Sequence, residues 1–534
     1  MKKAFIAVLL IAAVAAIVGA STASSASKKQ DLLVGYDHTP TAADKAAVAN
    51  AGGTIRHEFA SINVLAVSLP SGKSSDLRSQ TGVSYVEPDA VRTPLSLDSD
   101  LRSSELVPAP GNGLYGLVTT HTVEAQAAGY TGAGVKACVA DTGLDTRHPD
   151  IAPNLLDTYD VFSHTEGLHA TDVNDLGVAS TETHATHVTG IVAGALNGYG
   201  IHGVAPNASI LEARVLGTQL DGSVSGETSQ VMEGVAWLAA HGCKVINMSL
   251  GGGDRSQAEE ALYNQVIQDG TTIVVATGND SASQLSFPGR YQNVISVGAV
   301  DSSNHLASFS NTGAQIDLVG PGVDNLSSFP QGQGRDAEVS VNGATVMGNP
   351  AEFSSATAGI TGPFVNCGQM LTATACGTTP SGQWVAVVQR GAISFAAKAH
   401  NAALAHASAV LLYNNTTVPV SPTLGTPDDN GTPWLPTIII SQAAGQAIVA
   451  SLPTSGTLYN IATNWNLDSG TSMATPHVTG VVALILGKNP TLNPHQIEMI
   501  LDKTATDLGV PNYDTTYGYG LVNAQAALAA TPAP

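Results

Sequence analysis

Short apolar strands alternate with helical patterns through the middle of the chain, and this alternation most constrains its fold. The strand-like runs are rich in β-branched residues. Helical patterns lie between several of them, at 184–195, 228–241 and 257–268. Such alternation predicts an α/β fold, a parallel sheet with helices on both faces. The expected strands are 135–140, 210–215, 245–250, 272–277 and 294–299.

Polar residues stand at the ends of several of these strands. Asp141, Ser249 and Asn279 all occupy such positions. The carboxyl ends of parallel strands share one edge of the sheet, and ligands bind there in open α/β folds. We therefore expect these three residues to lie near one site.

A serine, a histidine and an aspartate occur in contexts that suit nucleophilic catalysis. Ser472 follows Gly-Thr and precedes the apolar stretch 478–486, which predicts a buried helix. A serine hydroxyl is a weak nucleophile and needs a base and an orienting acid. His184, at the start of a predicted helix, and Asp141 could supply them. The order Asp, His, Ser is one of the known orders of a hydrolytic triad.

Six segments resemble, in order, the core of the subtilisin-like serine proteases, the subtilases. They are 139–145, 183–190, 203–209, 245–252, 274–279 and 467–480. The resemblance implies a serine endopeptidase in which Ser472 attacks the peptide carbonyl, His184 moves the proton and Asp141 orients the imidazole. It also implies that the Asn279 side chain and the Ser472 backbone N–H bind the oxyanion.

Neighbouring residues compete for two of these roles. His187 lies three residues after His184, and the resemblance assigns catalysis to the first histidine and a structural role to the second. Asp145 competes with Asp141, but we predict it to be a surface residue. His477, on the predicted buried helix, is expected to be a core histidine.

The resemblance also indicates where substrate and calcium would bind. A peptide would add as an extended strand, with residues 216–225 as the outer rim of its site. We expect broad specificity with an apolar preference. The resemblance also implies a calcium site formed by oxygen atoms, the ligands that calcium prefers. The alternative interpretation is that the residues expected to bind calcium are solvated turn residues. The expected walls of the primary pocket are Ser249, Leu250, Gly251, Ala276 and Gly278, and the expected calcium ligands are Asp150, Ala195, Asn197, Tyr199 and Ile201.

The N-terminal segments predict an exported precursor. Residues 1–26 hold two lysines and an apolar run short for a membrane span, which predicts a signal peptide; a retained anchor is the alternative. Residues 30–95 resemble the α+β propeptide of subtilases, which implies a folding chaperone and intramolecular inhibitor. The maturation cleavage is expected within 93–112.

An insertion separates the two parts of the predicted catalytic domain, 113–334 and 462–530. Residues 335–461 show a strand, helix, strand, strand pattern. This pattern resembles the β-rich protease-associated (PA) domain found inserted in many subtilases. The resemblance implies that the insertion modulates access to the catalytic site.

Composition limits the partners and the compartment. The net charge of −21 argues against nucleic acid or an anionic membrane as a partner. We expect a secreted monomer that acts on protein or peptide substrates.

Cys367 and Cys376 lie close in a loop-like stretch and predict a local disulfide. Cys138 and Cys243 are either buried thiols or a second bridge.

Two other functional hypotheses accompany the protease. One is a binding protein built on an inactive protease scaffold, which the intact triad and propeptide disfavour. The other is a processing protease of narrow specificity, gated by the inserted domain.

Overall fold

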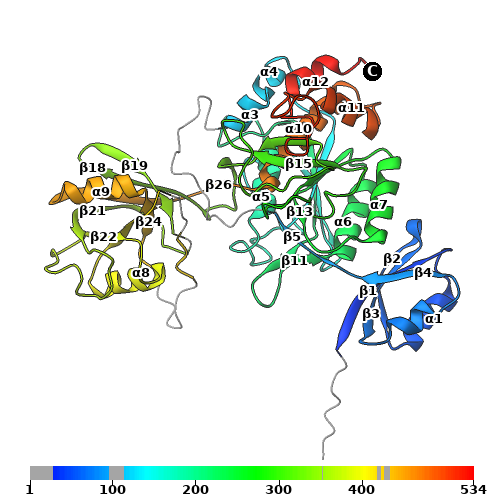
Figure 1. Cartoon of the computed structure of the whole chain (residues 1–534), viewed down its shortest axis with the longest axis horizontal. Helices are drawn as coiled ribbons and strands as arrows, with labels where there is room; N and C mark the ends of the chain where they lie inside the picture. The colour runs from blue at the N-terminus through cyan, green and yellow to red at the C-terminus, as the bar shows by residue number, and fades with distance from the viewer. Residues whose placement is uncertain (1–27, 96–113, 352, 418–421, 426–432) are drawn as a thin grey trace, which may run out of the picture.

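The computed structural model describes residues 28–95, 114–351, 353–417, 422–425 and 433–534. Figure 1 shows three units, a central α/β unit with an N-terminal unit and an inserted unit on either side. The predicted signal peptide 1–26 lies outside the described residues, as does most of the predicted cleavage segment.

The central unit is built on an eight-stranded sheet in the order β16-β15-β14-β12-β6-β9-β7-β8. All neighbouring pairs are parallel except β7 and β8, which are antiparallel. The predicted α/β fold is therefore confirmed, and every expected strand is present. The strands are β6 (Lys136–Asp141), β7 (Leu155–Asp160), β8 (Thr165–Glu166), β9 (Ser209–Arg214), β12 (Val245–Met248), β14 (Thr272–Ala276), β15 (Ile295–Val300) and β16 (Leu318–Pro321).

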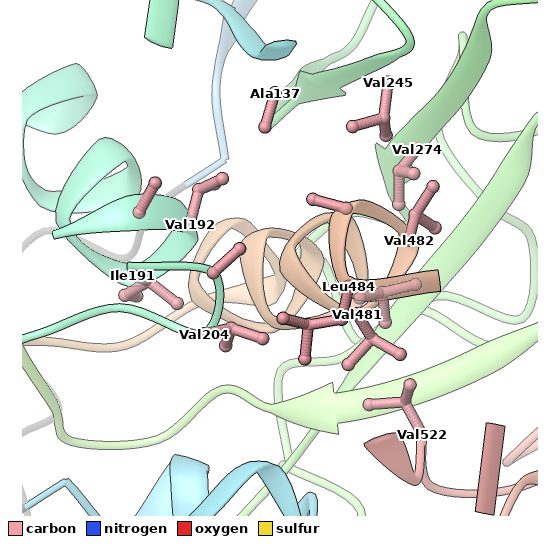
Figure 2. Packing of buried hydrophobic residues seen from close by; sticks show 14 of the residues in the cluster. Ala137, Ile191, Val192, Val204, Val245, Val274, Val481, Val482, Leu484 and Val522 are labelled. Atoms are coloured by element: carbon pink, nitrogen blue, oxygen red, sulfur yellow. The ribbon is translucent and has the colours of Figure 1, made fainter. Parts of the chain in front are cut away.

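Helices cover both faces of this sheet. Helices α5 (His184–Ala193) and α10 (Thr471–Lys488) pack in one apolar cluster, and α6 (Thr228–Ala240) and α7 (Gln257–Gln268) pack in another. Residues 471–486 of α10 are all buried, so the helix that begins beside Ser472 is fixed along its length. Figure 2 shows its surroundings, with Val481, Val482 and Leu484 of α10 near Val245 and Val274 of the sheet and Ile191 and Val192 of α5.

The N-terminal unit is a four-stranded sheet that rests on α6 and α7. Its Leu33, Val64 and Ala66 belong to the same apolar cluster as those two helices. The following strand, β5 (Val91–Pro94), leaves this sheet and joins strands of the central unit. The unit contains β1 (Lys29–Tyr36), α1 (Ala42–Asn50), β2 (Thr54–Phe59), β3 (Val64–Pro70), α2 (Ser74–Arg78) and β4 (Val83–Pro88).

The inserted unit has an eight-stranded sheet of its own, in the order β19-β18-β25-β21-β22-β23-β24-β20. The chain enters and leaves it through an antiparallel stem of β17 (Asn325–Ser328) and β26 (Trp465–Asp468). The sheet spans 334–463, close to the predicted 335–461. Its elements are β18 (Gly334–Val341), β19 (Ala344–Met347), β20 (Asn349–Pro350), β21 (Thr357–Asn366), β22 (Val385–Gln389), α8 (Phe395–Leu404), β23 (Ala409–Tyr413), β24 (Thr437–Ile440), α9 (Gln442–Ala450) and β25 (Thr454–Thr463).

Two disulfides link the cysteines. Cys367 is bonded to Cys376 within the inserted unit. Cys138 of β6 is bonded to Cys243, which resolves the alternative that the sequence left open. Within the described ranges, no helix has the length and apolar character that a membrane crossing requires.

Candidate active site

The sheet brings Asp141 and His184 together across 43 residues of sequence. Strand β6 ends at Asp141 and helix α5 begins at His184, and both side chains are buried. Nδ1 of His184 lies 2.7 Å from Oδ1 of Asp141, which also accepts the N–H of Thr142 at 2.7 Å. Burial lowers the pKa of His184, but the charge and hydrogen bond of Asp141 outweigh it, so the pKa is raised above its ordinary value.

Ser472 lies in the first turn of α10, against the same edge of the sheet. Its hydroxyl donates to the carbonyl oxygen of Ser249 at 3.0 Å. Nε2 of His184 is buried and has no hydrogen-bond partner among the described residues. In this structure Nε2 of His184 is therefore a free acceptor, while the Ser472 hydroxyl is bonded to Ser249.

Asn279 and Ser472 converge on a single carbonyl oxygen. Oδ1 of Asn279 accepts the N–H and the hydroxyl of Thr471 at 2.9 and 2.8 Å, which fixes the orientation of the amide. Nδ2 of Asn279 donates to the carbonyl oxygen of Leu95 at 2.5 Å, and the N–H of Ser472 donates to the same oxygen at 3.3 Å. Two converging donors are the arrangement of an oxyanion hole.

The carbonyl in this position belongs to the chain itself. Strand β5 pairs antiparallel with β11 (Val224–Glu227) on one side and β13 (Leu250–Gly251) on the other. The N–H of Leu95 donates to the carbonyl oxygen of Ser249 at 3.2 Å. Residues 91–95 therefore lie as an extended substrate would.

The outer rim strand lies slightly later in the sequence than predicted. The expected rim was 216–225, but β5 pairs with Gly226 and Glu227. The first two residues of β11, Val224 and Ser225, pair instead with β10 (Gly217–Thr218) in a hairpin.

Two of the predicted pocket residues, Leu250 and Gly251, lie against Pro94 and Leu95. A Cβ atom at Gly251 would lie 2.8 Å from Cδ1 of Leu95, so any larger residue there would obstruct the leucine side chain. Leu250 pairs with Pro94 in the β13–β5 ladder. Ala276 ends β14 and Gly278 follows it, so both lie on the side of the site that carries the oxyanion donor.

His187 lies in α5 and occupies a structural position against the stem of the inserted unit. Its Nε2 lies 2.9 Å from the carbonyl oxygen of Asn325 in β17 and 3.1 Å from that of Asn466 in β26. The side chain is buried. His187 thus ties both stem strands to the helix that carries His184.

Asp145 and His477 are both buried. The prediction of Asp145 as a surface residue is wrong, because its Oδ2 accepts the N–H of Gln331 at 2.8 Å, in the segment that leads into the inserted unit. His477 matches a core histidine, with Nδ1 2.8 Å from the carbonyl oxygen of Met473 and a pKa that burial lowers to about 4.

The expected calcium ligands form a hydrogen-bonded loop. Oδ2 of Asp150 accepts the indole N–H of Trp465 at 2.6 Å and the N–H of Ile201 at 3.2 Å. Oδ1 of Asn197 accepts the N–H of Tyr199 at 2.9 Å. Oδ1 of Asp150 is buried without a hydrogen-bond partner among the described residues, which favours a cation there. The part of the chain that the structure describes holds no group of three or more His, Cys, Asp or Glu residues that could bind a metal.

Comparison with known proteins defines the class. The subtilase family matches residues 132–386 and 413–520, and the PA domain matches residues 360–448. The chain therefore belongs to the subtilase family and is a serine endopeptidase with an inserted PA domain.

Two relatives are similar to this chain over more than half of its length. Subtilisin E of Bacillus subtilis (strain 168) is 31% identical over 321 residues, which are 59% of this chain and 77% of subtilisin E. The alkaline protease of Alkalihalobacillus alcalophilus is 35% identical over 274 residues, 51% of this chain and 64% of that protease.

Two solved structures share the fold. The psychrophilic subtilisin-like protease Apa1 from the Antarctic psychrotroph Pseudoalteromonas sp. AS-11 has 27% identity and a TM-score of 0.56, and the match covers 79% of this chain and 99% of that one. Fervidolysin from Fervidobacterium pennivorans, a keratinolytic enzyme related to subtilisin, has 23% identity and a TM-score of 0.61, over 95% of this chain and 62% of that one.

Sequence reasoning did not identify Leu95 or Thr471 as parts of the site. The sequence predicted only that the maturation cleavage falls within 93–112, and it did not distinguish one peptide bond from another in that range. Thr471 could have been found from its position next to Ser472, but its bonds to Asn279 join residues 192 positions apart.

Proposed function

We propose that this serine endopeptidase is an exported, self-processing zymogen that cuts its own chain after Leu95. One observation carries the proposal: the carbonyl oxygen of Leu95 accepts hydrogen bonds from Nδ2 of Asn279 and the N–H of Ser472. The preceding strand β5 is paired on both sides. The peptide bond after Leu95 is thus presented as a scissile bond. Two disulfides suit an oxidising compartment outside the cytoplasm.

The chemistry begins with a change of serine rotamer. The Ser472 hydroxyl turns from the Ser249 carbonyl to Nε2 of His184, which has a free acceptor. Oγ then bonds to the carbonyl carbon of Leu95, its proton passes to His184, and the carbonyl electron pair moves to the oxygen held by the two donors. Asp141 stabilises the imidazolium through its 2.7 Å hydrogen bond.

Collapse of this intermediate breaks the bond to the next residue. His184 gives its proton to the leaving amine, and the Leu95 carbonyl remains as an ester on Ser472. A water molecule, deprotonated by His184, then attacks the ester and releases the Leu95 carboxylate. Ser472 recovers its proton, so the cycle consumes one water per bond cut.

After the cut, the N-terminal unit acts as an inhibitor because its contacts do not depend on the broken bond. Arg56 reaches Oδ2 of Asp89 at 2.9 Å and donates to the Ser229 hydroxyl of α6 at 2.7 Å. The Leu95 end of β5 still fills the catalytic site. Proteolysis of this unit would free the mature enzyme.

The first pocket favours apolar residues, since the Leu95 side chain is buried against Gly251. We propose that the mature, monomeric enzyme cleaves proteins and peptides broadly at this position. The inserted domain would modulate access, because its returning strand β26 leads directly into the Ser472 segment. The Asp141–His184 pair and the two donors that converge on the Leu95 carbonyl argue against a binding protein on an inactive scaffold.

Parallel expression of the wild-type chain and Ser472→Ala tests this function. We expect the wild type to release a fragment that ends at Leu95, read by mass spectrometry, and to clear casein, whereas Ser472→Ala stays full length. Ser303→Ala, in an exposed loop, is the matched control and should mature normally. Equal maturation and casein digestion by wild type and Ser472→Ala would refute the assignment.

A further inference from the structure

Arg92 is fully buried in a segment that must leave the enzyme. It is the fourth residue before the proposed cleavage, counting Leu95 as the first. Within residues 91–95, Arg92 and Leu95 are buried, Pro94 is half-buried, and Val91 and Thr93 are exposed. The central unit therefore encloses two side chains of this segment, one apolar and one cationic.

The arginine is bound through its whole guanidinium. Nη2 lies 2.6 Å from Oε2 of Glu259 and Nε lies 3.3 Å from Oε1, which makes the pair bidentate. Nη1 donates to the carbonyl oxygen of Gly252 at 2.5 Å, and Nη2 also donates to that of Asp254 at 3.2 Å. Both side chains of the ion pair have no exposed surface. Such forked, charge-assisted contacts are strong and geometrically selective.

The central unit also orients this carboxylate. Glu259 lies in the first turn of α7, and its N–H is capped by the Ser256 hydroxyl at 3.1 Å. The phenol of Tyr263 donates to Oε1 at 3.0 Å, and that of Tyr291 donates to Oε2 at 2.8 Å. These partners remain when the N-terminal unit departs. The site is thus prepared for an incoming guanidinium, which lowers the ordering cost of binding.

We propose that Glu259 is a specificity-determining residue, and that the mature enzyme selects substrates with arginine at the fourth residue before the cleaved bond. This inference rests on the proposed function and narrows it to polypeptides that carry arginine, two intervening residues and an apolar residue before the cut. An apolar side chain would leave a buried carboxylate without its cation, which is costly. Lysine supplies charge without the fork, and an acidic residue would meet like charge.

A peptide series tests the proposal on the mature wild-type enzyme. Four quenched-fluorescent peptides share leucine before the cut and differ only at the fourth residue, which is Arg, Lys, Leu or Glu. We expect kcat/KM for Arg to exceed that for Leu on the order of ten- to a hundredfold. Lys should fall between them, and Glu should be the slowest.

Two variants on α7 connect this selectivity to one side chain. Glu259→Gln keeps the shape but removes the charge, so the Arg-to-Leu ratio of kcat/KM should fall towards one. Glu260→Gln removes the charge of the next residue, which pairs with Arg255 outside this pocket, and should keep the wild-type ratio. If Glu259→Gln does not mature, the wild-type peptide series decides alone.

The outcomes separate this inference from the function on which it depends. Equal kcat/KM for all four peptides would overturn the arginine selectivity and leave the protease intact. Cleavage of no peptide by the wild type would instead refute the proposed function. In the full chain, Arg92→Leu should slow self-cleavage by a factor similar to the Arg-to-Leu ratio, and an unchanged maturation rate would contradict the proposal.

Discussion

At the scale of single residues, the site depends on neighbours that restrict each functional side chain. Thr471 donates twice to Oδ1 of Asn279 and so directs the amide nitrogen at the Leu95 carbonyl. Asp141 does the same for the imidazole of His184. Pre-orientation of this kind avoids reorganisation during the reaction.

Removing the oxyanion donor should reduce kcat rather than binding. For Asn279→Ala we expect a loss of about a hundred- to a thousandfold in kcat with little change in KM, a magnitude that derives from subtilisin, a relative of this chain. Steady-state kinetics on one peptide measures it. Asn293→Ala, at an exposed position, should be neutral; a kcat for Asn279→Ala within a few-fold of wild type would contradict the role of Asn279.

The acid limb of the pH profile should report on His184. The imidazole must be neutral to accept the serine proton, and Asp141 raises its pKa. Activity is therefore lost, as the pH falls, at a higher pH than for an ordinary imidazole. In Asp141→Asn the two contributions of Asp141 are lost and burial is opposed only by the charge of Asp468, so the limb should move to lower pH while kcat falls about ten-thousandfold. An unmoved limb in this variant would contradict the assignment.

At the scale of elements, the N-terminal unit uses one carboxylate to cap helix α7. Oε1 of Glu87 accepts the Ser256 hydroxyl at 2.7 Å and the N–H of Ala258 at 3.1 Å, and Oε2 accepts the N–H of Gln257 at 3.0 Å. Free N–H groups and the helix dipole favour an anion at this end. The N-terminal unit thus completes a helix of the central unit.

Loss of this cap should weaken the inhibitor. Added to mature enzyme, an N-terminal unit with Glu87→Ala should inhibit roughly 2- to 30-fold less tightly, the range for a lost helix cap. Inhibition constants from peptide hydrolysis measure the change. Glu58→Ala, which removes a carboxylate that pairs with Lys45 inside the unit, is the matched control. Equal constants for both variants would contradict the capping role.

At the scale of the whole molecule, the inserted domain is attached through a stem that the catalytic unit holds firmly. Ser328 and Trp465 face each other at the end of this stem that is next to the inserted sheet. His187 contacts both strands of the stem. The inserted sheet also has apolar clusters of its own. The insertion can therefore alter what reaches the site without building the site.

A variant that lacks 329–464, with a short turn joining Ser328 to Trp465, tests whether the inserted domain alters access without forming the catalytic site. We expect the shortened enzyme to hydrolyse small peptides within a few-fold of the wild type, because the stem strands and the triad remain. Its cleavage pattern on folded proteins should change. An unchanged pattern on peptides and folded proteins alike would show that the inserted domain does not modulate access.

Calcium is expected to stabilise the loop around Asp150 without taking part in the chemistry. If the unpartnered Oδ1 of this buried carboxylate binds the ion, excess chelator should lower the melting temperature of the mature enzyme. Asp150→Asn should melt lower than the wild type and respond less to chelator. Identical melting of the wild type with and without chelator would exclude a stabilising site.

The sequence by itself determined the α/β fold, the order of the units and the candidate triad. Buried parallel strands are apolar runs, and their alternation with helices leaves few arrangements. Asp141, Ser249 and Asn279 could be located in the sequence because each stands at the end of one of these apolar strands. The sequence could not show that Asp145 is buried, because Gln331, which contacts it, lies 186 residues later.

Only the tertiary structure decided that the Leu95 carbonyl lies in the site and which side chains contact residues 91–95. Leu95 meets Asn279 across 184 residues, and Arg92 meets Glu259 across 167. Neither pair has a local pattern, because hydrogen bonds between distant segments depend on how the sheet and helices pack. Local periodicity therefore fixed the scaffold, while long-range packing fixed which residues contact Leu95 and Arg92.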